Sequence, residues 1–203
     1  MKRDDLDFGP GVLALPGHPG SPSCVMWMTG LSGAGKSTLA QGLRARLQGE
    51  QVASVILDGD EVRGGLSRGL GFSQEDRSEN IRRMAEVARL LSRQGMLVIV
   101  AAITPLQAQR AMAREIVGEA FREIHVHAPF ALCEQRDVKG LYARARRNEI
   151  AAFTGISDSY EPPVAPDLVI DTSACRLADA VEALLLAFGT APRPVVAPLG
   201  ARA

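Results

Sequence analysis

The chain has 203 residues, 46% hydrophobic and 23% charged, which is enough to bury one substantial core, so we expect a single folded domain. Lys and Arg together number 23, as do Asp and Glu, so no net charge draws the protein to nucleic acid or to an anionic membrane surface. The three cysteines form no CxxC pair, and no stretch approaches the roughly 18 apolar residues of a membrane span.

The two ends of the chain differ in composition from its middle. Residues 1–22 carry charged residues followed by Gly and Pro, and they lack the apolar core of a signal peptide. Together with the odd cysteine count, this favours a cytoplasmic protein. We expect a flexible segment over residues 1–22, a domain over 23–190, and a loose Pro- and Ala-rich tail over 191–203.

Short apolar runs alternate with segments of helical spacing along the middle of the chain. The runs are nearly all apolar, as in strands of a parallel sheet that is covered on both faces. The predicted strands are Cys24–Thr29, Val52–Leu57, Leu97–Ala102, Phe121–Val126 and Leu168–Ile170. The predicted helices are Lys36–Gln48, Ser73–Gln94, Gln107–Val117 and Leu177–Phe188. This alternation predicts an α/β domain with a five-stranded parallel sheet and helices on both faces.

Two further features complete the expected architecture. The helix over Ser73–Gln94 has one apolar face, made of Ile81, Met84, Val87, Leu90 and Leu91. Residues 137–163 interrupt the alternation with several arginines, a glycine and a pair of prolines, and we interpret this lid segment as a mobile cover over a site.

A Gly-rich segment follows the first predicted strand. It reads Gly-Leu-Ser-Gly-Ala-Gly-Lys-Ser, which matches the P-loop pattern GxxxxGK[ST] at every fixed position, and it precedes a predicted helix as the motif requires. Backbone N–H groups of such a loop close around a polyphosphate, so a P-loop NTPase fold is expected. Lys36 should bridge the β- and γ-phosphates, and the Ser37 hydroxyl should ligate Mg²⁺. The predicted ATP-binding residues are Gly30, Leu31, Ser32, Gly33, Ala34, Gly35, Lys36, Ser37 and Thr38.

Two carboxylates stand at the end of the second predicted strand. The third strand ends at Ala102 without an Asp, so the usual Walker B carboxylate is missing there. Asp58 and Asp60 instead follow the second strand, and the carboxyl ends of parallel strands face the ligand crevice. One of them can face Mg²⁺ and the other an attacking hydroxyl, which suits a kinase better than a motor or a GTPase. Without the neighbouring P-loop, this pair would be interpreted as an ordinary Asp-Gly turn.

Several arginines follow the two carboxylates. They are Arg63, Arg68, Arg77, Arg82 and Arg83. Guanidinium groups pair bidentately with phosphate or sulfate oxygens, so they suit an acceptor substrate that carries its own anionic group. For any one of these arginines, a solvated helix face is the alternative explanation.

Residues from about 24 to 188 resemble the adenylylsulfate kinase family, in segments more specific than a P-loop. These segments are Leu57–Asp60 with Val62-Arg63, Leu70–Ser73, Asp76-Arg77, Glu79–Arg83, Arg136–Tyr142, Ala145-Arg146, Phe153–Ile156 and Tyr160–Pro162. The resemblance implies ATP-dependent phosphorylation of the 3′-hydroxyl of adenosine 5′-phosphosulfate (APS), which gives 3′-phosphoadenosine 5′-phosphosulfate (PAPS) and ADP. It implies Mg²⁺ as the cofactor.

The resemblance also implies roles for individual residues. The catalytic residues would be Lys36, Asp60 and Asp58, with Asp60 preferred for orienting the hydroxyl and for holding Mg²⁺ with Ser37. The substrate would be contacted or enclosed by Asp60, Arg63, Phe72, Arg77, Asn80, Ile103, Thr104, Lys139 and Phe153. Phe72 and Phe153 are the candidates to sandwich its adenine ring. Arg144, Arg146 and Arg147 of the lid segment are all candidates to close over the phosphates.

Three positions depart from the family pattern. The family usually has Phe-Ile-Ser-Pro after the third strand, and in some members that serine carries a phosphate, whereas this chain has Ala102-Ile103-Thr104-Pro105. We therefore expect no phosphorylated intermediate, and Thr104 is expected only to line the site. Gln107 replaces a common arginine. Glu61 replaces a common asparagine, and its charge either weakens substrate binding or faces solvent.

Two other functions remain open from the sequence. One is a related P-loop kinase acting on a nucleoside, a sugar acid or an antibiotic hydroxyl, and the other is a nucleotide-binding regulatory subunit without turnover. By analogy with the family we expect a homodimer. Some enzymes of this type associate with the sulfurylase that makes their substrate, so a separate ATP sulfurylase is a candidate partner.

Overall fold

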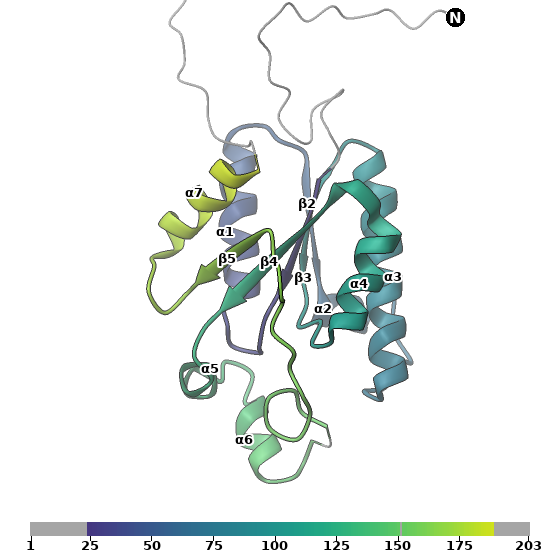
Figure 1. Cartoon of the computed structure of the whole chain (residues 1–203), viewed down its shortest axis with the longest axis vertical. Helices are drawn as coiled ribbons and strands as arrows, with labels where there is room; N and C mark the ends of the chain where they lie inside the picture. The colour runs from purple at the N-terminus through teal and green to yellow at the C-terminus, as the bar shows by residue number, and fades with distance from the viewer. Residues whose placement is uncertain (1–23, 151, 189–203) are drawn as a thin grey trace, which may run out of the picture.

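The computed structural model describes residues 24–150 and 152–188, so the predicted flexible segment 1–22 and tail 191–203 lie outside the described residues. Five strands form one parallel sheet with the order β2-β3-β1-β4-β5 (Figure 1). They are β1 (Cys24–Thr29), β2 (Ser54–Asp58), β3 (Leu97–Ala101), β4 (Phe121–His127) and β5 (Leu168–Asp171). After β1 the chain crosses to β2 on one side, and after β3 it crosses over β1 to β4 on the other side, so the two connections diverge between β3 and β1. A ligand crevice is expected at the carboxyl ends around such a switch point.

Helices cover both faces of the sheet, as the alternation predicted. The elements are α1 (Lys36–Gly49), α2 (Gly59–Gly64), α3 (Gln74–Arg93), α4 (Gln107–Val117), a 3₁₀ turn η1 (Gly118–Ala120), α5 (Phe130–Arg136), α6 (Leu141–Arg146) and α7 (Leu177–Ala187). In Figure 1, α1 and α7 lie on one face and α3 and α4 on the other. Among the helices of the described ranges, none combines the length and apolarity that a membrane crossing needs. The P-loop NTPase fold with a five-stranded parallel sheet is confirmed.

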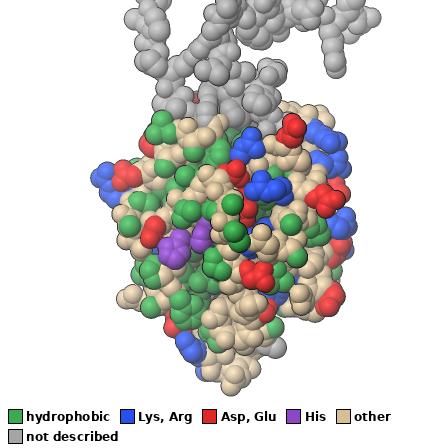
Figure 2. All heavy atoms as spheres, in the orientation of Figure 1, with side chains coloured by type: hydrophobic (Ala, Val, Ile, Leu, Met, Phe, Trp, Pro, Cys, Tyr) green, Lys and Arg blue, Asp and Glu red, His purple; other side chains and the backbone are tan. Residues whose placement is uncertain are grey.

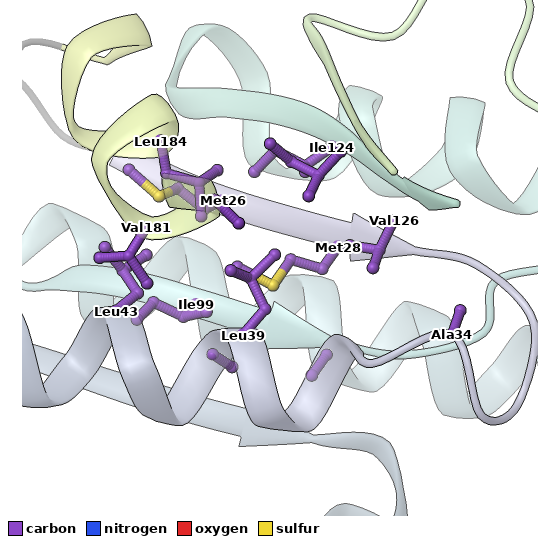
Figure 3. Packing of buried hydrophobic residues seen from close by; sticks show 14 of the residues in the cluster. Met26, Met28, Ala34, Leu39, Leu43, Ile99, Ile124, Val126, Val181 and Leu184 are labelled. Carbon is purple, nitrogen blue, oxygen red and sulfur yellow. The ribbon is translucent and has the colours of Figure 1, made fainter. Parts of the chain in front are cut away.

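The alternation of side chains along β1 divides the core into two clusters. Met26 and Met28 point to the α1 and α7 side, where they pack with residues such as Leu43 and Leu184 (Figure 3). Trp27, with its neighbours Val25 and Val98, belongs to the cluster under α3 and α4. Every side chain of β1 and β3 is buried, which accounts for the unbroken apolar runs in the sequence. Truncating Leu43, which has no exposed surface, to Ala would cost roughly 3 kcal/mol.

Local signals explain where two helices begin. The Ser73 side chain accepts a hydrogen bond from Asp76 N (3.1 Å) and caps α3. The Asp58 side chain accepts one from Asp60 N (2.9 Å) and caps α2, so this segment is the first turn of a helix and not the ordinary Asp-Gly turn that was the alternative. Short helices such as α2, α5 and α6 were not predicted, because six or seven residues carry too little periodicity.

One expectation about packing was wrong, and one segment is buried more deeply than was predicted. Leu90 is 57% exposed, so it does not share the buried face of α3 with Ile81 and Met84. The lid segment was interpreted only as a cover over a site, but it contains α6, and its Tyr142 and Phe153 belong to the hydrophobic cluster under α1. The side chains of the lid segment therefore help to fill the core as well as to cover the crevice. Its mobility stays a prediction.

Charges of both signs are interspersed on the surface over α3 and α4 (Figure 2). Helix α3 contributes i,i+3 and i,i+4 ion pairs such as Arg89–Glu86 (2.7 Å) and Arg83–Glu79 (2.8 Å). This matches the equal numbers of acidic and basic residues in the sequence. Arg82 also pairs with Glu79. Arg82 and Arg83 therefore belong to a solvated helix face, which was the alternative to a role in binding an anionic substrate.

Candidate active site

The P-loop runs from the end of β1 to the start of α1, and neighbouring backbone restricts it to glycine at two positions. A Cβ on Gly30 would lie 2.2 Å from the carbonyl oxygen of Val126, and one on Gly33 would lie 2.7 Å from that of Cys133. The loop is thus held by the end of β4 and by α5. Tyr142 adds a third support, since its hydroxyl donates to the carbonyl of Ser32 (2.9 Å).

Lys36 is buried at the centre of this loop. Its ammonium donates hydrogen bonds to the carbonyl oxygens of Gly30 and Leu31, both at 2.8 Å. Burial, reinforced by the nearby ammonium of Lys139, lowers the pKa of Lys36 from 10.5 to about 8. An ammonium held in this way gains most from an anionic ligand, because a phosphate supplies the negative charge that its surroundings lack.

The two predicted carboxylates have different partners. Asp58 accepts a 2.6 Å hydrogen bond from the Ser37 hydroxyl, so it lies directly against the P-loop. Asp60 is more exposed and forms an ion pair with Lys139 of the lid segment. Sequence reasoning paired Ser37 with Asp60, whereas the structure places Asp58 against it, because Asp58 ends β2 beside β3 while Asp60 is carried outward on α2.

A first cavity of about 380 Å³, here called the P-loop cavity, opens over this loop. The predicted ATP-binding residues that line it are Ser32, Gly33, Gly35, Lys36, Ser37 and Thr38; Gly30, Leu31 and Ala34 are outside its lining. Sequence reasoning missed its far wall, formed by Arg136, Thr172, Cys175, Arg176 and Ala180. Arg136 ties that wall to the P-loop by donating to Gly33 O (3.1 Å) and to Thr172 Oγ1 (3.0 Å). No local sequence pattern indicates this wall, because β5 and α7 are far from the P-loop in the chain and come close to it only in the folded sheet.

A second cavity of about 310 Å³, here called the arginine cavity, adjoins the first. It gathers nearly all of the predicted substrate residues: Asp60, Arg63, Phe72, Arg77, Asn80, Ile103, Thr104 and Phe153. Lys139 lines only the P-loop cavity. Asp60 and Ile103 line both cavities, so the two spaces meet at the DxD segment and at the end of β3.

The two phenyl rings of the arginine cavity are in different environments. Phe72 is 64% exposed and lies under the guanidinium of Arg63, 4.6 Å from its ring centroid. Phe153 is 7% exposed and packs edge-on against Tyr142, with ring centroids 4.9 Å apart. Phe153 is therefore a core residue that also contributes to a cavity wall.

Arg77 connects α3 to the lid segment. It donates to Thr154 Oγ1 (3.1 Å) and to Asp158 Oδ2 (2.9 Å), and it also contacts the carbonyl oxygens of Phe72 and Ala152. The neighbouring Asn80 is 4% exposed. Asn80 Oδ1 has no hydrogen-bond partner among the described residues, so a ligand donor in the arginine cavity would satisfy it.

The remaining candidate residues are also placed. Of the lid arginines, Arg144 lines the arginine cavity, while Arg146 pairs with Glu134 and Arg147 with Glu149. Glu61 is exposed on α2 and lines neither cavity, so it faces solvent. Gln107 is also exposed; its backbone N–H donates to Glu161 (2.6 Å), a contact that does not depend on its side chain.

A P-loop, a carboxylate against its serine and an adjoining cavity lined by arginines and aromatic rings define a P-loop kinase for a small anionic acceptor. The model of the family described as adenylylsulphate kinase matches residues 22–171. The adenylyl-sulfate kinase of Paraburkholderia xenovorans is 58% identical over 161 residues, which cover 79% of this chain and 90% of the relative. That of Shewanella amazonensis is 55% identical over 161 residues, covering 79% and 80%.

A solved structure agrees with these relatives. The Mycobacterium tuberculosis APS kinase in complex with AMPPNP and APS superimposes with a TM-score of 0.80 at 41% identity, over 83% of this chain and 98% of that one. The chain belongs to the adenylylsulphate kinase family, and it is a kinase.

Proposed function

We propose that the P-loop cavity binds ATP, that the arginine cavity binds APS, and that the chain transfers the γ-phosphoryl group to the 3′-hydroxyl of APS. One observation carries this assignment to the two cavities: Asp60 and Ile103 line both, so two ligands bound in them would meet beside a carboxylate. In-line transfer between two bound nucleotides depends mainly on such positioning.

On the donor side, Lys36 is the charged group of the loop. With the triphosphate bound, its ammonium exchanges the carbonyl oxygens of Gly30 and Leu31 for phosphate oxygens. Helix α1 begins at Lys36, so its N-terminal N–H groups face the same anion. Arg136 and Thr172 form the wall on which the nucleoside end of ATP rests.

On the acceptor side, Arg63 and Arg77 supply positive charge for the phosphosulfate, and Phe72 supplies an exposed aromatic face for the adenine. Asp60 orients the 3′-hydroxyl. The O3′ atom then bonds to the γ-phosphorus while the bond to the β,γ-bridging oxygen breaks, which leaves ADP and PAPS; the hydroxyl proton passes to Asp60 or to water. Lys139, which pairs with Asp60 in the structure, is placed to neutralise charge at this junction.

The donor set around Ser37 suits Mg²⁺. The Ser37 hydroxyl and the Asp58 carboxylate are hard oxygen ligands 2.6 Å apart, beside the loop that holds the phosphates. Within the described ranges, no group of three or more His, Cys, Asp or Glu side chains forms a complete metal site. Mg²⁺ usually keeps waters and binds through one or two protein ligands and phosphate oxygens, so this set is sufficient. When bound, the ion neutralises charge on the phosphates.

A coupled assay with MgATP and purified protein tests the assignment. The acceptors are APS, AMP, gluconate and shikimate, and the product is identified by mass spectrometry. We expect ADP and PAPS in equal amounts when APS is the acceptor. We expect no turnover with AMP, because AMP lacks the sulfate that the arginines recognise, or with gluconate or shikimate. Lys36→Met should abolish turnover without unfolding the protein. Turnover of gluconate or shikimate instead of APS, or ADP release that ignores every acceptor, would exclude the assignment.

The assembly and the setting of the enzyme belong to the same proposal. We propose a cytoplasmic homodimer that can associate with a separate ATP sulfurylase. Light scattering during size-exclusion chromatography should give twice the chain mass of 21.6 kDa. A monomeric mass at micromolar concentration would exclude the dimer.

A further inference from the structure

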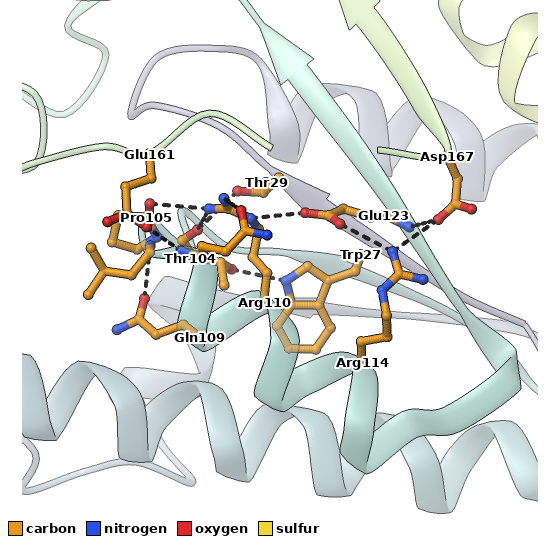
Figure 4. A network of polar contacts seen from close by, with 12 residues as sticks. Trp27, Thr29, Thr104, Pro105, Gln109, Arg110, Arg114, Glu123, Glu161 and Asp167 are labelled. Atoms are coloured by element: carbon orange, nitrogen blue, oxygen red, sulfur yellow. Dashed lines mark hydrogen bonds and ion pairs between the residues drawn. The ribbon is translucent and has the colours of Figure 1, made fainter. Parts of the chain in front are cut away.

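A buried ion pair lies beneath residues 102–105, which join β3 to α4 and line the arginine cavity. Arg110 of α4 and Glu123 of β4 pair through Nε and Oε1 at 2.9 Å, and their side chains are 3% and 10% exposed. Arg114 reaches the second oxygen of Glu123 (3.2 Å) and also Asp167 (3.4 Å), as Figure 4 shows. A fully buried arginine needs partners for all of its donors, so the remaining contacts of Arg110 are informative.

Those contacts are made to the backbone of residues 102–105. Arg110 Nη1 donates to the carbonyl oxygens of Thr104 (3.0 Å) and Pro105 (3.2 Å), and Nη2 donates to Gln107 Oε1 (3.2 Å). The guanidinium thus joins Glu123 on one side to two consecutive carbonyl groups on the other (Figure 4). A lysine has one charged nitrogen and cannot span the same set of acceptors.

The backbone that Arg110 holds is strained. Thr104 has a φ of 44°, a left-handed conformation that is unfavourable for a β-branched residue. Further hydrogen bonds support it: the Trp27 indole donates to Thr104 Oγ1 (3.0 Å), and the Thr29 hydroxyl donates to Ile103 O (2.6 Å). Such a conformation persists only where surrounding contacts impose it.

We infer that Arg110, held by Glu123, is a positioning residue that keeps residues 102–105 in the shape required for the acceptor substrate. The inference rests on the proposed function of the arginine cavity, because Ile103, Thr104 and Pro105 form one of its walls. Arg110 itself lines neither cavity, so it acts through the backbone and not by contact with substrate. The donor is held mainly by the P-loop, so losing this support changes acceptor binding selectively.

Arg110→Lys tests the inference, because it keeps the charge opposite Glu123 and removes the fork that reaches the two carbonyl groups. We expect the KM for APS to rise five- to twentyfold, with the KM for ATP within twofold and kcat within threefold of the unmodified protein. Arg114→Lys is the matched control, since Arg114 lies on the same helix and shares Glu123, while its other contacts are to Asp167 and to the ring of Phe121. It should leave both KM values within twofold.

Trp27 gives a second readout that needs no substrate. It is the single tryptophan of the chain, has no exposed surface, and donates to Thr104. Its fluorescence maximum or intensity should change in ligand-free Arg110→Lys and not in Arg114→Lys. If the unmodified protein fails to turn over APS, the proposed function fails, whereas this spectral comparison still reports on the support of residues 102–105.

Three outcomes would overturn the positioning role of Arg110. An unchanged KM for APS in folded Arg110→Lys, or equal increases in the KM for APS and ATP, would overturn the positioning role. Should Arg110→Lys not fold, the double variant Arg110→Met with Glu123→Leu removes both charges together and is judged by the same ratio of KM values. If neither variant folds, the pair is a stability element and the inference is wrong.

Discussion

The Ser37 hydroxyl donates a 2.6 Å hydrogen bond to Asp58, and the other carboxylate oxygen of Asp58 caps helix α2 by accepting from Asp60 N. One side chain therefore connects the phosphate-binding loop to the helix that carries the second carboxylate. Helix α2 follows β2, whereas the phosphate-binding loop follows β1. The position of Asp58 relative to Ser37 therefore depends on the pairing of β2 with β3 and of β3 with β1.

Asp58→Asn separates these two roles. Asn caps helices nearly as well as Asp, so the free energy of unfolding should change by less than about 1 kcal/mol. The charge that faces Mg²⁺ and the Ser37 hydroxyl is lost, so kcat should fall roughly 100-fold. Steady-state kinetics and thermal unfolding measure the two effects. Asp58→Ala is the control, because it removes the cap as well and should cost an additional ~1 kcal/mol. A kcat within threefold for Asp58→Asn would show that the carboxylate is not needed.

ATP affinity should depend on pH through Lys36. In the free protein, burial and the nearby Lys139 lower the pKa of Lys36 to about 8, whereas a bound triphosphate raises it again. Lys36 is protonated in both states below pH 8, so affinity is constant there; above pH 8 binding must take up a proton. Affinity should then weaken by up to ~10-fold per pH unit. Calorimetry with a non-hydrolysable ATP analogue, in buffers of different ionisation enthalpy, measures the affinity and the number of protons taken up on binding.

A variant of the second ammonium checks the cause of this pH dependence. Lys139 is the second contribution that lowers the pKa of Lys36, after burial. Lys139→Gln should therefore move the onset of the weakening to higher pH without removing it. Affinity that stays constant between pH 7.5 and 9 in the unmodified protein would contradict the assignment to Lys36.

The two phenylalanines of the arginine cavity should respond differently to truncation. Phe153 is buried against Tyr142, so Phe153→Ala should lower the free energy of unfolding by roughly 3 kcal/mol. Phe72 is mostly exposed, so Phe72→Ala should leave stability within ~0.5 kcal/mol. If its ring stacks on the adenine, the KM for APS should rise about tenfold. Chemical denaturation and kinetics on both variants test this, with Phe72→Tyr as the control that keeps an aromatic face. Equal stability losses would contradict the difference in burial.

Thr104 should not become phosphorylated. Its side chain is buried, with the residue 1% exposed, and its hydroxyl accepts the Trp27 indole hydrogen bond at 3.0 Å. Attack on a γ-phosphate would require the turn to open and this bond to break. Incubation with [γ-³²P]ATP followed by peptide mass spectrometry should therefore find no phosphothreonine at this position. Stoichiometric phosphate on Thr104 during turnover would contradict the buried geometry.

The sequence by itself determined the class of the protein. Five apolar runs alternating with helical segments predicted the parallel sheet, because buried strands need apolar residues on both faces. The P-loop pattern predicted the phosphate site, since glycine is required where the loop approaches other backbone, as at Gly30 against Val126. Both patterns involve residues that are close together in the chain, so they can be recognised from the sequence without the fold.

Only the tertiary structure decided which groups face one another. It placed Asp58, not Asp60, against Ser37, and it added Thr172 and Arg136 to the wall of the P-loop cavity. It also placed Arg110 beneath the strained Thr104. Each of these relationships joins residues on different elements, and the register of the sheet sets their distance. A pattern in the sequence records which residue types are present, whereas a hydrogen bond between distant elements depends on how the whole sheet brings their ends together.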